Sequence, residues 1–536
     1  MRIVSIIAAA LAAVAATVSL EAASGGGAAL RQTGSTFRAA AVTGWFGAID
    51  PALTGSPVDA TVLQPACGSL LAYPVKGLPA GGNLGPELAE SEPSISRNRR
   101  AYTFRIRKDA RFSNGAAVTA RDFKHTFERI FTPSMRSTYP EPYLNIVGAQ
   151  AMLDGAATTL SGITAQGRTL TIRLRRPVFD FPARLSLICV VPSNLPVDPE
   201  GARAPIPSAA PYYFAEYVPG ERVVLQGNRF YRGPRPRHVE RITVDLAADA
   251  TVVDKVASGE LDTVLGTPDL NARLPELAKR YGLNKGRFFS LPSLATRMFF
   301  LNTSRPLFRN NPRLRQALNF AVDRRALTRE LGAYVASPTD QYLPPTMPGF
   351  RDERIYPLKG PDVRRARELA KGNTRSGRAV LYTCSRPDCL AAGQILQRNA
   401  AAIGIEVQIV QFPTALFFDK IGTPGEPYDL AWVGWVAAWN DPLYFMGLFD
   451  GRTLEQPRTD NYSRFDSPAY TRLIDRASRL SGVARYEAFG RLDVELARDA
   501  APAIAYANGN SWAFVSARTG CVVMNPYFDL TSVCLK

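Results

Sequence analysis

The sequence predicts an α/β fold with mixed sheets, built from many short elements. Alternating apolar and polar residues predict strands at Tyr102–Arg107 and Thr169–Leu174. Between residues 379 and 410 a strand, a helix and a second strand follow one another, and Gly404 ends the helix. A helix between two such strands implies a parallel pair joined by a right-handed crossover. The 41 Gly and 41 Pro residues divide the rest of the chain into short elements.

The other elements are predicted from local signals along the chain. A turn at residues 113–115 precedes a helix from Thr119, in which apolar residues recur at helical spacing up to Ile130. The clearest helix is predicted to begin at Pro312. Proline suits the first helical position, because the N–H that it lacks would have no partner there. The remaining predicted elements are strands at Arg222–Leu225, Arg241–Asp245, Ala379–Thr383 and Glu406–Val410, and a helix at Ala391–Ala402.

The N-terminus has the pattern of a secretory signal. Arg2 precedes an apolar run from Ile3 to Val18, and small residues follow through Ser24. We therefore predict a signal peptide over residues 1–24 and a flexible Gly-, Ala- and Ser-rich start over residues 25–35. An uncleaved N-terminal anchor is the alternative, because no cleavage site is sharp. No later apolar run reaches the roughly 20 residues that span a bilayer, so the mature chain is expected to be soluble.

Six cysteines lie beyond the signal, and an even number in an exported chain favours disulfides. Two pairs are close in sequence, and elimination leaves the third. The predicted pairs are Cys384 with Cys389, Cys521 with Cys534, and Cys67 with Cys189. Metal ligation is the rival interpretation, but neither of the two histidines lies near a cysteine pair. We expect no metal and no cofactor.

The formal net charge of +17 raises the question of a nucleic-acid partner. The basic residues are spread along the chain instead of being gathered in one helix or tail, and export argues against such a partner. No nucleic acid is therefore expected. The charge is interpreted as a solvated surface with a mild preference for acidic ligands or anionic membranes.

Signatures of catalysis are absent from the sequence. It has no Gly-x-Ser-x-Gly, Ser-x-x-Lys or His-Glu-x-x-His motif, no Walker A lysine and no dinucleotide fingerprint. A Ser-His-Asp triad would need His125, which lies in an amphipathic helix pattern, or His238, which lies in a predicted loop. Nothing supports a glycosidase with two carboxylates, although counting alone does not exclude one. The sequence predicts a protein that is not an enzyme.

Five segments resemble, in order and spacing, the family 5 extracellular solute-binding proteins, which serve ABC importers of oligopeptides, dipeptides and nickel. Each motif alone is weak, and their collinear order carries the resemblance. They read YTFRIRKDARFSNGAAVTARD (102–122), APYYFAEYVPGERVVLQGNRFY (210–231), ASGELD (257–262), FLNTSRPLFRNNPRLRQALNFAVDR (300–324), and GWVAAWNDP (434–442) followed by NYSRF (461–465).

The resemblance implies a two-lobed periplasmic-binding-protein fold of type II, cluster C, with an extra subdomain in lobe I. The resemblance also implies hinge closure around a ligand, a permease partner in the membrane and a monomeric state. It further implies that the protein is secreted and located in the periplasm or on the outer face of the cytoplasmic membrane. The implied boundaries are 36–71 and 205–287 for lobe I, 72–204 for the inserted subdomain, 288–502 for lobe II, and 503–536 for the return to lobe I.

The candidate ligand site centres on the segment that, in the family, pairs with peptides through its main chain. Its residues are Gly434, Trp435, Val436, Ala437, Ala438, Trp439 and Asn440. Trp432 is expected in the core, whereas Trp435 and Trp439 are expected in a loop, where large aromatic residues indicate a pocket. Two further candidates lie outside this segment. Tyr506 matches the family's crossing strand, with hinge core as the alternative. Arg297 could bind a ligand carboxylate or phosphate, with a surface ion pair as the alternative.

Ala438 departs from the family pattern. Peptide-binding members have an aspartate at this position, which binds the free α-ammonium group of the ligand. Alanine cannot do so, and Asp441 matches a different loop acid before Pro442. We therefore expect a ligand other than a free peptide bound in the usual manner: a blocked or modified peptide, or another small polar solute. A periplasmic hydrolase and a ligand sensor that docks to a receptor are the alternative functions.

Overall fold

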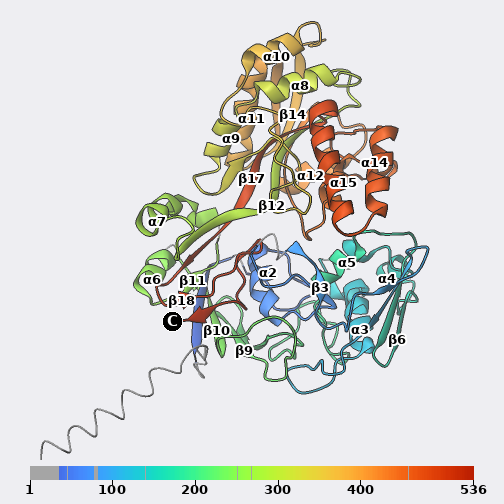
Figure 1. The fold of residues 1–536 in the computed structure, drawn as a ribbon, viewed down its shortest axis with the longest axis vertical. Coiled ribbons are helices and arrows are strands. Elements are labelled where there is room, and N and C mark those ends of the chain that lie inside the picture. The colour runs from blue at the N-terminus through green and yellow to red at the C-terminus, as the bar shows by residue number, and fades with distance from the viewer. Residues whose placement is uncertain are drawn as a thin grey trace, which may run out of the picture.

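The computed structural model describes residues 35–44, 46–77, 82–138, 140–249, 251–266, 268–456 and 458–536. The predicted signal peptide and nearly all of the predicted flexible start lie outside these residues. Two lobes meet at a junction, and the inserted subdomain lies beside lobe I (Figure 1). Within the described part of the chain, no helix combines the length and the apolar character needed to cross a membrane.

One large mixed sheet runs through both lobes. Its strand order is β15-β14-β16-β12-β17-β11-β1-β10-β9-β8, and β13 also pairs with β17. These strands are β1 (Thr36–Val42), β8 (Tyr212–Val218), β9 (Arg222–Gly227), β10 (Arg241–Ala248), β11 (Thr263–Val264), β12 (Phe288–Leu301), β13 (Ala336–Pro338), β14 (Arg378–Cys384), β15 (Glu406–Phe412), β16 (Leu430–Val436) and β17 (Ala503–Val515). The predicted strands near residues 222 and 241 are confirmed as β9 and β10.

The two longest strands join the lobes. β12 and β17 pair in antiparallel fashion from Phe288 opposite Phe514 to Phe300 opposite Ala503. At one end β17 also pairs with β11 of lobe I, and further along β12 pairs with β16 of lobe II. Figure 1 shows both strands rising from lobe I into lobe II. These crossing strands connect the two lobes, as the resemblance implies.

Lobe II contains the predicted strand, helix and strand unit. β14 and β15 pair in parallel and α11 connects them, which confirms that prediction. Helix α11 begins at Pro387, earlier than the predicted Ala391, because proline suits the first turn. The helix from Pro312 is confirmed as α8, and Leu314 and Leu318 of its stripe are buried. The lobe II helices are α8 (Pro312–Ala321), α9 (Arg324–Glu330), α10 (Val363–Ala370), α11 (Pro387–Ala401), α12 (Thr414–Gly422), α13 (Leu443–Met446), α14 (Pro468–Arg479) and α15 (Gly482–Glu495).

The inserted subdomain has its own sheet, ordered β4-β5-β7-β6, and its own hydrophobic core. The predicted strands at residues 102 and 169 are confirmed as β5 and β7. Helix α3 starts after Thr119 as predicted, because Thr119 and Asp122 form a capping box. The elements are β4 (Ser94–Ile95), β5 (Ala101–Arg105), β6 (Ile163–Gln166), β7 (Thr169–Arg173), α3 (Ala120–Phe131), α4 (Ala149–Leu153) and α5 (Phe181–Arg184).

The rest of the chain supplies small connecting elements. Lobe I has the helices α2 (Pro57–Leu63), α6 (Val252–Ser258) and α7 (Leu274–Tyr281). Two minor sheets pair β2 (Leu71–Ala72) with β3 (Gly85–Pro86), and β18 (Thr519–Gly520) with β19 (Cys534–Leu535). The short 3₁₀ turns are Gln64–Ala66, Pro133–Met135, Glu141–Tyr143, Leu185–Leu187, Pro268–Arg273, Gly447–Phe449 and Gly451–Glu455, and a π turn spans Leu496–Ala500.

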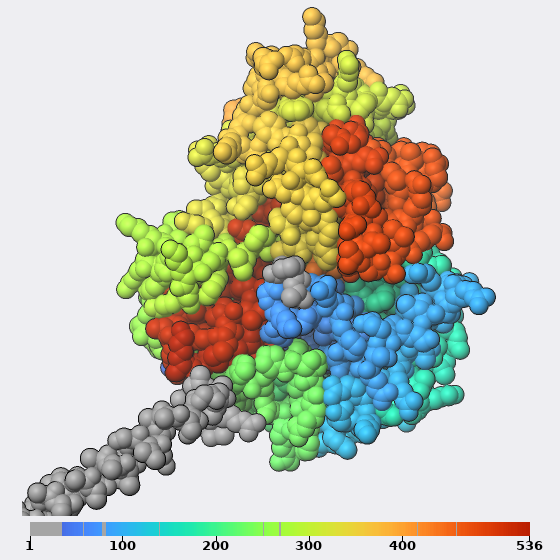
Figure 2. Space-filling model, viewed as in Figure 1, coloured from blue at the N-terminus to red at the C-terminus, as the bar shows by residue number. Residues whose placement is uncertain are grey.

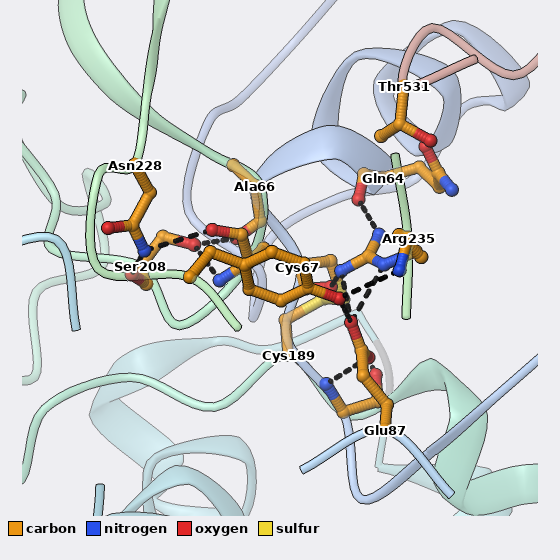
Figure 3. A network of polar contacts seen from close by, with 12 residues as sticks. Gln64, Ala66, Cys67, Glu87, Cys189, Ser208, Asn228, Arg235 and Thr531 are labelled. Atoms are coloured by element: carbon orange, nitrogen blue, oxygen red, sulfur yellow. Dashed lines mark hydrogen bonds and ion pairs between the residues drawn. A yellow bond between two sulfur atoms is a disulfide. The ribbon is translucent and has the colours of Figure 1, made fainter. Parts of the chain in front are cut away.

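A buried polar network holds the inserted subdomain against lobe I (Figure 3). The Arg235 guanidinium donates to Glu87 at 2.7 Å and to the carbonyls of Gln64 and Cys67. Arg235 belongs to lobe I and Glu87 to the predicted inserted subdomain, and both are almost fully buried. Because each donor finds an acceptor, this buried charge pair fixes the relative position of the two parts.

All three predicted disulfides are present. Cys67 bonds Cys189 across 122 residues, beside the network of Figure 3. The local pairs Cys384–Cys389 and Cys521–Cys534 are also bonded. Cys389 lies inside the first turn of α11 instead of before the helix, because α11 starts earlier than predicted. The structure describes no free cysteine.

A buried carboxyl group in lobe II leads to a prediction about pH. Asp493 on α15 is fully buried, and burial raises its pKa to about 7, although Gln341 and two backbone N–H groups donate to it. The folded state therefore binds a proton more tightly than the unfolded state does, and stability contributed by this group falls as pH rises from about 4 to 7. At about 1.36 kcal/mol per unit, the fall approaches ~4 kcal/mol.

Asp493→Asn should remove this slope, because asparagine does not ionise. Urea unfolding of both proteins at pH 4, 5.5 and 7 measures the difference. A wild-type curve that loses no more stability over this range than the variant's would contradict the prediction.

Candidate functional site

The predicted site segment starts on strand β16 and continues into the loop that follows. Trp435 pairs with Thr296 of β12, and Gly434 pairs with Arg297. The prediction that Trp435 lies in a loop is therefore wrong, because β12 gives β16 a partner as far as Val436. Trp432 is 4% exposed, which confirms its predicted place in the core.

The other edge of β16 is largely unpaired. β14 pairs with β16 only at Leu430 and Ala431. Beyond these residues β14 ends at the Cys384–Cys389 disulfide, and no described strand takes its place. No described strand pairs with this side of residues 434–436, which are half-buried or exposed. They therefore offer a free strand edge at the carboxyl ends of the parallel strands, which is where open α/β sheets bind ligands.

Trp435 is part of this free edge and is half-buried. Its ring centroid is 5.7 Å from that of Tyr444 and 6.3 Å from that of Tyr462. Its indole Nε1 is buried and has no hydrogen-bond partner among the described residues. Leaving a buried donor unpaired costs about 1–3 kcal/mol, so an acceptor on a ligand would gain at this position.

Trp439 joins lobe II to the inserted subdomain. Its Nε1 donates to Oδ2 of Asp180 at 3.0 Å, and the Arg184 guanidinium carbon lies 4.7 Å from its ring centroid. Arg184 also pairs with the same Asp180 oxygen at 3.1 Å. Trp439 is in a loop as predicted, but with 5% exposure its ring is packed against the opposing subdomain instead of lining an open surface.

Asn440 and Asp441 complete the loop. The Asn440 backbone N–H donates to the Tyr73 hydroxyl at 3.2 Å, and that hydroxyl donates to the Asn440 carbonyl at 3.4 Å. Asp441 forms two hydrogen bonds with Arg485, at 2.6 and 2.9 Å, inside a buried pair. Burial raises the Asp441 pKa and Arg485 limits the rise. Because Arg485 occupies both of its oxygens, Asp441 does not replace an aspartate at position 438.

Tyr506 and Arg297 differ in whether their side chains are free to contact a ligand. Tyr506 on β17 is fully buried and its hydroxyl accepts from Trp432 Nε1 at 2.7 Å. Burial raises its pKa to about 12. This packing favours the hinge-core alternative for Tyr506. Arg297 is half-buried, and no carboxylate of a described residue lies within 4 Å of its guanidinium. The surface ion pair considered for Arg297 is thus absent from the described residues.

The three small apolar residues of the segment lie between the two tryptophans. The Ala437 N–H donates to the Leu294 carbonyl at 2.8 Å, and its side chain is buried. Val436 is 50% exposed, and Ala438 is exposed as well. The exposed methyl of Ala438 offers no charge and leaves room beside Trp439. Among the described residues, no group of three or more His, Cys, Asp or Glu side chains is arranged to hold a metal ion.

The structure brings three further residues to the segment that sequence reasoning missed. Asp180 and Arg184 lie at the start and end of α5, and Tyr73 follows β2. All three come from sequence positions at least 255 residues before Trp439, so local patterns gave no signal for them. Their contacts with Trp439 and Asn440 place the segment at the junction between the two lobes, where Figure 2 shows them touching.

Comparisons with known proteins agree with this arrangement. The sequence profile of the bacterial extracellular solute-binding proteins, family 5, middle region, matches residues 83–455. The periplasmic oligopeptide-binding protein OppA of Escherichia coli is 26% identical over 458 residues, which cover 80% of each chain. The periplasmic murein peptide-binding protein MppA of Escherichia coli is 24% identical over 441 residues, covering 77% of this chain and 78% of its own.

Solved structures share the fold over nearly the whole chain. The unliganded open form of the murein tripeptide-binding protein MppA superposes with a TM-score of 0.77 at 20% identity, covering 94% of this chain and 97% of its own. This likeness confirms the predicted two-lobed α/β architecture, whereas the predicted domain boundaries stay predictions. The family profile covers well over half of the residues, and it supports binding without turnover. The chain belongs to the bacterial extracellular solute-binding proteins of family 5.

Proposed function

We propose that this solute-binding protein captures a peptide-like solute at the junction between its lobes and delivers it to the permease of an ABC importer. The protein acts as a monomer outside the cytoplasmic membrane. The observation that carries the proposal is the free edge of β16 at residues 434–436, which lies at the hinge and includes Trp435. An extended ligand can add to such an edge through main-chain hydrogen bonds, while neighbouring side chains select among ligands.

Several groups at the junction would bind parts of an extended ligand. Trp435 offers a ring face and a buried unpaired N–H. Arg297, on the strand next to β16, offers a guanidinium with no carboxylate partner among the described residues. Gly434, Val436, Ala437 and Ala438 supply main chain and little bulk, and Trp439 and Asn440 close the far end. Tyr506 supports the site from beneath through Trp432.

The relatives' names support the ligand class. Matched relatives are described as binding oligopeptides, murein peptides and D,D-dipeptides. A haem-binding relative also matches, at 23% identity. Ala438 makes the usual capture of a free α-amine from lobe II impossible here. A peptide with a blocked or modified N-terminus therefore fits better than a free peptide bound in the usual manner. Hydrolysis and sensing remain weaker alternatives, because family membership points to solute binding.

The test is a binding screen followed by one substitution. The purified protein is mixed with synthetic peptides of two to five residues, free and N-acetylated, and retained peptides are identified by mass spectrometry. Calorimetry then measures the affinity of the most enriched peptide. Retention of no peptide would contradict the proposed ligand class.

Arg297→Gln should weaken that peptide about 10- to 100-fold, because a charge-assisted hydrogen bond to the C-terminal carboxylate is worth about 1.5–3 kcal/mol. Amidation of the peptide's C-terminus should weaken wild-type binding equally and should not weaken the variant further. Arg398→Gln, which removes the same charge from an exposed position on α11, is the control and should bind like wild type. Full affinity in Arg297→Gln would remove Arg297 from the site.

A further inference from the structure

Two buried acceptor atoms at the junction lack hydrogen-bond partners. Oδ1 of Asp180 and Oδ1 of Asn440 are both inaccessible to solvent and accept no hydrogen bond from a described residue. Asp180 is 2% exposed and Asn440 is 7% exposed. Both lie next to Trp439, since Asp180 accepts from its indole nitrogen and Asn440 follows it in the chain. Nε of Arg184 and Nε of Arg485 are buried and unpaired as well, and neither bonds these acceptors. A donor from a ligand would satisfy them.

The charges around these atoms favour a cation. Asp180 shares its other oxygen, Oδ2, between Trp439 and Arg184. Burial is the largest cause of the raised pKa of Glu141 in the inserted subdomain. The negative charges of Asp460 in lobe II and of Asp180 raise this pKa further. The positive charge of Arg184 lowers the pKa of Glu141. Glu141 and Asp460 are themselves exposed, so water screens their charges, and Asp180 is the one buried carboxylate of the three.

The two arginines packed nearby already have partners. Arg485 is committed to Asp441 through two short hydrogen bonds. The guanidinium of Arg184 also donates to the Pro142 carbonyl. Asp180 is buried at this junction with Arg184 as its counter-charge, so a further positive group would stabilise its charge.

We propose that Asp180 binds a cationic group of the solute, an ammonium or a guanidinium, and so supplies from the inserted subdomain the negative charge that Ala438 does not supply from lobe II. Asn440 accepts a second hydrogen bond from the same group. The solute is thereby defined as a peptide-like molecule with a positive charge next to Trp439, held at its other end by Arg297. This inference rests on the proposed peptide-binding function.

This arrangement links specificity to closure. Asp180 and Tyr73 belong to the part of the chain around the inserted core, whereas Trp439 and Asn440 belong to lobe II. Separating the lobes would expose both acceptor atoms to water, and closing them would remove that water. A bound cation then restores the hydrogen bonds that the two acceptor atoms lose with that water. A neutral solute of the same shape would leave both buried acceptor atoms without a hydrogen bond.

The test compares peptides that differ only in charge. The enriched peptides are resynthesised with arginine or citrulline, and with lysine or norleucine, at each position, and calorimetry measures their affinities. We expect the charged peptide of the best pair to bind wild type at least 10-fold more tightly than its neutral partner. Equal binding of both members of every pair would overturn this inference and leave the proposed function intact. Retention of no peptide at all would overturn the proposed function itself.

Substitutions then assign the effect to Asp180. Asp180→Asn keeps an oxygen for Trp439 Nε1 and removes the charge. It should lose at least 10-fold in affinity for the cationic peptide and little for the neutral one, whereas a purely structural role would lower both equally. Asp154→Asn removes the same charge from an exposed position at the end of α4 and should change neither.

A rescue variant completes the test. Adding Ala438→Asp to Asp180→Asn places a carboxylate on the lobe II side of the same junction and should restore preference for the cationic peptide. An Asp180→Asn variant that keeps the full charge preference would show that another group binds the cation.

Discussion

Arg485→Met should destabilise lobe II by about 3–5 kcal/mol at neutral pH, because it leaves Asp441 buried without its counter-charge. Arg485 is 7% exposed in its side chain, and it binds both oxygens of Asp441. The unpaired carboxylate must then either stay charged in a poorly solvated position or take up a proton. Urea unfolding followed by tryptophan fluorescence measures the loss.

The pH dependence and two controls identify the cause. Burial already raises the Asp441 pKa, and losing Arg485 raises it further, so the destabilisation should shrink as pH falls and Asp441 protonates. Asp441→Asn combined with Arg485→Met should recover most of the stability. Arg491→Met on the same helix removes only an exposed pair with Glu487 and should cost at most about 0.5 kcal/mol. A single variant as stable as the double variant at pH 7 would contradict this account.

Trp435→Ala should weaken binding of the most enriched peptide about 30- to 1000-fold, the range expected when a central aromatic anchor is removed. The substitution removes both the ring packed on Tyr444 and Tyr462 and the unpaired indole N–H. Trp435→Phe keeps a ring and loses the donor, so its loss should be smaller, about 10-fold or less. Calorimetry on the three proteins gives the comparison.

A matched control separates binding from folding. Trp512→Phe changes a tryptophan of β17 whose Nε1 donates to Asn271 in lobe I, away from β16. It should leave peptide affinity unchanged, although it removes a hydrogen bond. Trp435→Ala with wild-type affinity would show that the solute is bound elsewhere.

The sequence determines much of the fold because local signals and burial patterns agree. The capping box at Thr119, the proline at position 312 and the alternation in β5 and β7 each predict an element that the structure contains. The disulfides follow from spacing and elimination. The prediction is least accurate at β16, because the alternation of apolar and polar residues ends at Val433. Pairing with β12 extends the strand to Val436. A strand edge depends on tertiary pairing, which sequence periodicity does not record.

The candidate site could be predicted only on one side. Motif order identified residues 434–440, and Arg297 was a candidate for its charge alone. Asp180, Arg184 and Tyr73 reach residues 439 and 440 only through folding. The substitution at Ala438 was visible in the sequence, whereas the carboxylate facing the same loop was not. Residues opposed across a junction belong to different hydrophobic cores, so no local pattern links them.

Small-angle X-ray scattering with and without a saturating enriched peptide tests the central claim, that a solute is captured between two closing lobes. The peptide should reduce the radius of gyration, because it draws together the two sides of the junction at which Trp439 and Asp180 meet. The ligand-free protein should be more expanded, because no solute bridges its lobes. Identical curves in the presence and absence of a peptide that calorimetry shows to be bound would contradict the account.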